Sequence, residues 1–171
     1  MFEIDITNHQ VHSSADHARL RSAAQHVLRE EGIASAAISI AIVDDSTIHE
    51  LNRRYLQHDY ATDVLSFLLE RDGDHLDGEV IVSADTAAAS AQRFGSAVAD
   101  ELLLYVVHGL LHLVGYDDQT PDDRARMRQR ERRCLARFGF RPEYDRDSSA
   151  PSTEGISAAG RQDPTDGESA A

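Results

Sequence analysis

The 171-residue chain has the length of one domain with a full-sized hydrophobic core and some additional chain. Apolar residues make up 41% of it, but no apolar run reaches the roughly 18–20 residues that span a membrane. The net charge of −13 argues against non-specific nucleic-acid binding by the whole surface. These features, with no signal pattern at the N-terminus, predict a soluble cytoplasmic protein.

The first part of the chain predicts two strands around one helix. Residues 2–6 alternate between apolar and polar side chains, which is typical of a half-buried strand. Ser13 or Ser14 can cap a following helix that Gly32 ends. Residues 36–43 are apolar and β-branched, and they predict the second strand.

The middle of the chain predicts two more strands, each next to a helix. Thr47, with a glutamate three residues later, fits a capping box for a short helix to about residue 55. Residues 64–69 and 79–83 read as strands, and an alanine-rich helix is expected over residues 84–94.

The last part of the chain predicts two helices and a tail. An apolar helix is expected over residues 97–114, and a threonine cap followed by proline begins another helix at residue 120. Residues 148–171 are too polar to bury a core, so we expect a disordered acidic tail after a domain spanning residues 1–147. The expected fold is a single α+β domain with a four-stranded sheet and about five helices.

The basic charge of the chain is unevenly placed and is all guanidinium. There is no lysine, and eight arginines lie within residues 124–141, where Glu131 is the sole acid. Arginine can bind phosphate through a forked pair of hydrogen bonds, although genome composition is the simpler explanation for a lack of lysine. Cys134 lies among these arginines and is interpreted as a structural residue.

The segment HGLLHLVGYDD, residues 108–118, carries the clearest chemical signal. His108 and His112 project from the same face of a helix, and Gly115 can turn the chain so that Asp118 reaches the same ion. This spacing is the one used by zinc proteases on their metal helix. The sequence therefore predicts one divalent metal ion, with zinc favoured.

Two positions in this segment modify the prediction. Metalloproteases have a glutamate base directly after the first histidine, but this chain has Gly109, so peptide hydrolysis is disfavoured. Asp117 is an alternative third ligand, and spacing alone favours Asp118. An aspartate ligand adds a negative charge and weakens the pull of the metal on its bound water.

The same segment resembles the signature HGxLHLxGYDH of the YbeY family, the bacterial endoribonucleases of ribosomal RNA maturation. The stretch LNRRYLQHDYATDVLSF at residues 51–67 is similar to a second family motif, and GEVI at residues 78–81 to a third. The resemblance implies an α+β fold, one zinc-type ion in a cleft, and cleavage of single-stranded RNA. It also implies a task in small-subunit ribosomal RNA processing and ribosome quality control, with ribosomal components as partners.

Three positions depart from the family pattern. The third metal histidine is Asp118, an arginine considered important for activity is Leu56, and a proline is Leu68. Arg53 and Arg54 lie within one turn of Leu56 and are candidate substrate-binding residues, although arginines on a short exposed helix are more often solvated.

No residue identifies itself as the general base, so the catalytic residues are left open. We expect Thr62, Asp63 and Ser66 to have a scaffold role, through hydrogen bonds to the nearby backbone, and not to contact substrate. The leading hypothesis is a metal-dependent endoribonuclease. The alternatives are a ribosome-assembly factor with a structural metal, and a hydrolase of another substrate with Asp85 or Glu101 as base.

Overall fold

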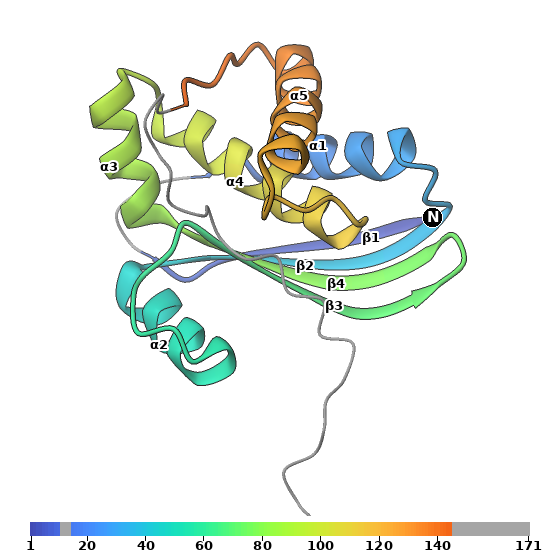
Figure 1. Ribbon diagram of the computed structural model, residues 1–171, viewed down its shortest axis with the longest axis horizontal. Coiled ribbons are helices and arrows are strands. Elements are labelled where there is room, and N and C mark those ends of the chain that lie inside the picture. The colour runs from blue at the N-terminus through green and yellow to red at the C-terminus, as the bar shows by residue number, and fades with distance from the viewer. Residues whose placement is uncertain (11–14, 145–171) are drawn as a thin grey trace, which may run out of the picture.

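The computed structural model describes residues 1–10 and 15–144, and it shows one four-stranded sheet with helices on both faces (Figure 1). The helices α1, α3, α4 and α5 lie on one side of the sheet, and α2 lies on the other (Figure 1). The elements are β1 (Phe2–Asn8), α1 (His17–Glu30), β2 (Ser35–Val43), α2 (Asp45–Leu56), β3 (Val64–Asp72), β4 (His75–Ser83), α3 (Ala84–Phe94), α4 (Val98–Leu113) and α5 (Pro121–Arg137). The predicted α+β fold is confirmed.

The strand order is β1-β2-β4-β3. The pairs β1–β2 and β2–β4 are parallel, whereas β3 and β4 form an antiparallel hairpin. The apolar side chains of β2 alternate between the two faces, so each face of the sheet has a cluster of its own. The larger cluster packs under α1 and α4, and the smaller one packs under α2.

The helix α4 is the central element of the larger layer. It packs against α1, α3 and α5 as well as against β3 and β4. Ten of its sixteen residues are buried, which agrees with the apolar character predicted for residues 97–114. The histidine pair of the sequence therefore lies on the helix that the whole layer surrounds.

Several predicted element ends were displaced. Asp16 caps α1 by accepting the Arg19 amide at 3.0 Å, whereas Ser13 and Ser14 lie outside the described residues. The predicted capping box at Thr47 is wrong, because Asp44 accepts the Thr47 amide at 2.8 Å and is the N-cap of α2, three residues before the predicted one.

The strand β4 begins at His75, four residues before its predicted start. The pairing of Asp72 with His75 makes the β3–β4 turn tighter than expected. The sequence pattern did not predict this part of the strand because polar residues interrupt it. Its alternate residues Leu76 and Gly78 are nevertheless buried. The predicted tail, residues 148–171, lies outside the described residues, so the domain boundary stays a prediction.

Within residues 1–10 and 15–144, no single helix is long and apolar enough to cross a membrane. The helices α3 and α4 together have the length and composition of a membrane span, but they meet at a bend of 118°.

Cys134 should be chemically unreactive in the native protein. It is 6% exposed, and burial raises the pKa of its thiol to about 11. Because the thiolate is the reactive form, alkylation at pH 8 should be at least about 100-fold slower in native than in urea-unfolded protein. Equal rates for the native and unfolded protein, followed by mass spectrometry, would show that this face of α5 is open.

Candidate metal centre

The two histidines of α4 converge on one point. Their Nε2 atoms lie 3.0 Å apart, with the ring centroids separated by 4.6 Å. This convergence follows from the helix itself, since side chains four residues apart stack on the same face. When both imidazoles are neutral, two nitrogens at this distance can both present lone pairs, an arrangement that a shared cation stabilises.

Asp118 reaches the same point because the chain turns sharply after α4. Gly115 has φ +114°, which a side chain would disfavour, and the Tyr116 amide donates to the Leu111 carbonyl at 3.0 Å to close the helix. Asp118 Oδ2 lies 3.6 Å from the Nε2 atoms of both histidines. The three predicted ligands His108, His112 and Asp118, called the trio below, are thus brought together, whereas Asp117 is exposed.

The surroundings of Asp118 indicate what the trio can hold. Its side chain is 2% exposed, and neither carboxylate oxygen has a hydrogen-bond partner among the described residues. An ionised carboxylate buried in this way is strongly destabilising unless a positive charge compensates it. Two imidazole nitrogens and one carboxylate are also a ligand set that zinc accepts, so these residues fit a divalent metal ion.

The outer nitrogens of both histidines are held by fixed acceptors. His112 Nδ1 donates to the Tyr116 carbonyl at 3.0 Å, and His108 Nδ1 contacts the Glu131 carboxylate. Because a carbonyl cannot donate, the proton of His112 is on Nδ1, and its Nε2 lone pair points toward His108 and Asp118. Such outer partners set the tautomer and orientation of metal-binding histidines.

Glu131 of α5 is the residue of this centre that sequence reasoning missed. It is 2% exposed and accepts the Tyr144 hydroxyl at 2.5 Å. Burial by itself lowers the pKa of His108, but the charge and hydrogen bond of Glu131 outweigh burial and raise this pKa to about 9. The signal that could have identified it was its isolation as the sole acid within residues 124–141.

Gly109 shows why no glutamate base follows the first histidine. A Cβ atom at this position would lie 2.7 Å from Val80 Cγ1 and 3.0 Å from Ser66 Oγ. The Ser66 hydroxyl also donates to the Gly109 carbonyl at 3.0 Å. The helix is therefore seated so closely on β3 and β4 that the metalloprotease arrangement is sterically excluded.

A cleft of about 100 Å³ opens beside the trio. It is lined by residues of the α2–β3 loop, α4, the α4–α5 loop, α5 and the segment after α5, namely Asp63, Leu104, Tyr105, His108, Asp118, Arg124, Met127, Arg128, Glu131 and Tyr144. Asp63, for which we expected a backbone role, accepts the Val64 amide at 2.9 Å and also reaches the cleft wall.

The other proposed bases do not line this cleft. The Asp85 carboxylate accepts the Asp45 amide at 2.8 Å and so caps α2. Glu101 is buried and accepts the Ser96 hydroxyl at 2.7 Å, and burial raises its pKa. The cleft carboxylates other than Asp118 are Asp63 and Glu131.

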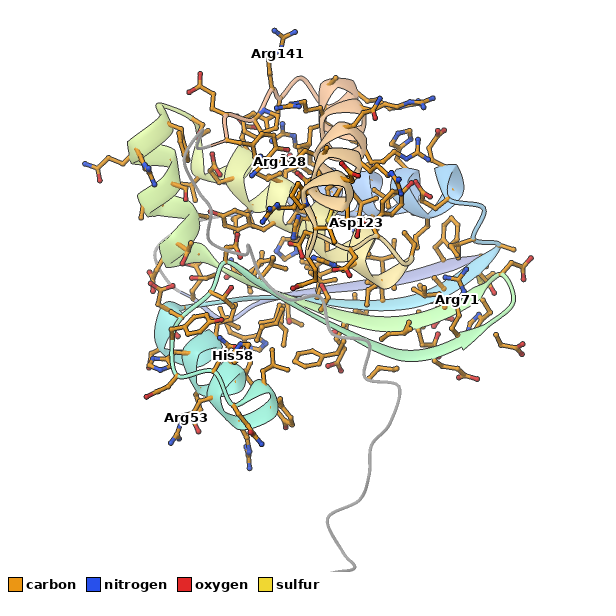
Figure 2. The ribbon with its side chains drawn as sticks, in the orientation of Figure 1. Arg53, His58, Arg71, Asp123, Arg128 and Arg141 are labelled. Atoms are coloured by element: carbon orange, nitrogen blue, oxygen red, sulfur yellow. The ribbon has the colours of Figure 1, made fainter. Side chains whose placement is uncertain are left out.

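Arg53 and Arg54 lie on α2, which is across the sheet from α4 and α5 (Figure 1). Figure 2 shows Arg53 on this side. Arg53 pairs with Glu50 at 2.8 Å, and neither arginine lines the cleft. Leu56, where the family pattern has arginine, packs against the smaller apolar cluster. Apolar contact thus takes the place of a guanidinium at this position.

Comparisons with known proteins agree with this geometry. The family model described as Endoribonuclease YbeY matches residues 5–139. Endoribonuclease YbeY of Rhodopirellula baltica is 44% identical over 124 residues, which are 71% of this chain and 64% of that protein. The Salinibacter ruber protein of the same name is 43% identical over 128 residues, covering 70% and 82%. The one from Syntrophotalea carbinolica is 39% identical over 142 residues, covering 79% and 95%.

A solved structure shares the fold. The solution structure of TM1509 from Thermotoga maritima superposes with a TM-score of 0.54 at 24% identity, covering 88% of this chain and 99% of that one.

Replacing Gly109 with alanine tests the close seating of α4. Helix propensity alone favours alanine by about 1 kcal/mol, whereas overpacking costs about 1–3 kcal/mol. We expect Gly109→Ala to lower the free energy of unfolding in urea because its Cβ meets Val80. Val80→Ala removes that contact, so the double variant should lose less than the two single losses added together. A Gly109→Ala variant more stable than wild type would contradict the packing.

Proposed function

Because the chain belongs to the YbeY family of endoribonucleases, which are metal-dependent hydrolases, we propose that it cuts single-stranded ribosomal RNA at the cleft beside His108 and Asp118. One observation carries the proposal, namely the buried Asp118 carboxylate that faces two histidine nitrogens and has no hydrogen-bond partner within the described residues. Family membership favours this enzyme over an assembly factor or a hydrolase of another substrate.

We propose His108, His112 and Asp118 as the metal ligands and zinc as the ion. Three protein ligands of nitrogen and oxygen type are usual for a catalytic zinc site, which keeps a further coordination position open. Bound there, zinc would supply a Lewis acid that polarises a phosphate oxygen or activates a nucleophile. The aspartate leaves less positive charge on the ion than a third histidine would.

The chain's own groups prepare the site for this chemistry. Glu131 and the Tyr116 carbonyl fix the two imidazole rings, so the ligands need little rearrangement on binding.

The biological task that we propose follows from the family. The substrate is small-subunit ribosomal RNA, acted on during maturation and quality control in the cytoplasm, with components of the small subunit as partners. Residues 1–147 are the proposed catalytic domain, and residues 148–171 an acidic tail outside it. Arg53 and Arg54 remain candidate contacts for RNA on the opposite side of the sheet.

The ligand assignment predicts different effects at two adjacent aspartates. Asp118→Asn should weaken zinc binding at least about tenfold, because even outer partners of a metal site contribute 10- to 100-fold by order of magnitude. Asp117→Asn is the matched control and should change affinity less than about twofold, since that side chain is exposed and contacts the Asp118 amide. Competition with a chromogenic chelator measures both, and the opposite ranking would reassign the ligand.

Cleavage of a single-stranded fragment of small-subunit ribosomal RNA tests the activity. We expect His112→Ala to cut at least about 100-fold more slowly than wild type, since metal stabilisation of a transition state is worth several kcal/mol. His75→Ala, a histidine outside the centre, should cut normally. Circular dichroism checks that the variants fold, and Asp118→Asn replaces His112→Ala if the latter does not. Equal cleavage by folded wild type and variant would remove the proposal.

A further inference from the structure

Two arginines of α5 face the metal cleft. Arg124 and Arg128 are four residues apart, so they lie on the same face of the helix, about 6 Å apart along its axis. Both line the cleft together with His108 and Asp118. Figure 2 shows Arg128 on the α4 side of α5, whereas Arg141 points away from the molecule.

These two arginines differ from others on the same helix in their partners. Arg130 pairs with Glu31 at 2.8 Å, and Arg126 lies 3.9 Å from Asp123. Within residues 1–10 and 15–144, no carboxylate lies at ion-pair distance from Arg124 or Arg128. Their charge is therefore available to an anion that enters the cleft from outside.

Arg128 is held in position by a residue beyond the part of the chain that the family model matches. Its guanidinium lies 4.8 Å from the centre of the Tyr144 ring, and Arg132 lies 4.9 Å from the same ring. The Tyr144 hydroxyl is anchored on Glu131 at 2.5 Å. A guanidinium stacked on an anchored ring loses less freedom when it binds a ligand.

The charges of the cleft indicate why such groups are needed. Asp63, Asp118 and Glu131 all line it, and three carboxylates would repel a phosphate. The two positive charges of a divalent ion are fewer than the three negative charges of these carboxylates. The ion and two arginines together carry four positive charges, which exceed them. Guanidinium also matches phosphate geometry, since its planar fork can contact two oxygens at once.

We propose that Arg124 and Arg128 are the phosphate-binding wall of the metal cleft, each contacting the backbone of single-stranded RNA beside the ion, and that Tyr144 positions Arg128. This inference rests on the proposed function and adds to it the residues that hold the substrate. It places RNA along α5 on the helical side of the sheet.

The test is the salt dependence of RNA binding by the full-length, zinc-loaded protein. The probe is a fluorescein-labelled single-stranded 2′-O-methyl oligonucleotide, checked on a gel for integrity after each titration. Each phosphate contact adds about 0.7 to the slope of log affinity against log salt for a single strand. Replacing both arginines with glutamine (Arg124→Gln with Arg128→Gln) should therefore lower the slope by about 1.4.

Matched variants distinguish the loss of these two phosphate contacts from a general loss of positive charge on the protein. Arg126→Gln removes the same charge from the same helix away from the cleft, and it should leave the slope unchanged. Arg128→Lys should keep the slope of wild type because the charge remains. Tyr144→Ala should weaken binding roughly two- to fivefold. Tyr144→Phe should weaken it less than Tyr144→Ala does, because its ring still stacks on Arg128 although the hydroxyl bond to Glu131 is lost.

The outcomes separate this inference from the proposed function. Wild type that cuts RNA, combined with equal slopes for the double variant and Arg126→Gln, overturns the inference and leaves the function standing. Wild type that neither binds nor cuts RNA overturns both. Unchanged affinity in Tyr144→Ala overturns the positioning role of Tyr144.

Discussion

The close seating of α4 on β3 and β4 is the constraint on which the rest of the molecule depends. At Gly109 the helix backbone comes so near to Val80 and Ser66 that no side chain fits between them. This contact fixes the rotation of α4 about its axis. As a result, the single helix face that carries both His108 and His112 turns away from the sheet, toward α5 and the chain that follows Gly115.

The centre that results is an arrangement of buried charge. Asp118 and Glu131 are both almost fully buried, one facing the inner nitrogens of the histidines and the other an outer nitrogen. Buried carboxylates are costly unless each has compensating partners. Glu131 has His108 and Tyr144, whereas Asp118 has none besides the histidines, so a metal ion should contribute to folding as well as to catalysis.

The departures from the family pattern can be understood in the same physical terms. Leu56 is half-buried and packs on the apolar cluster under α2. The positive charge that lines the cleft comes from Arg124 and Arg128 of α5. Neither arginine has an acidic partner in the described part of the chain. At the proposed third ligand position the imidazole of the family pattern is replaced by the Asp118 carboxylate, which preserves a donor atom and would alter the charge at a bound ion.

The sequence by itself determined the fold class and the central helix, and it indicated the candidate metal trio of His108, His112 and Asp118. The trio depends on local spacing, since His108, His112, Gly115 and Asp118 all lie within residues 108–118. Tertiary structure alone decided that Glu131, Tyr144, Arg124 and Arg128 share the cleft, because that depends on how α5 crosses α4. Tertiary structure also decided that Arg53 and Arg54 lie on the other side of the sheet. The position of α2 depends on long-range packing, which no local sequence pattern encodes.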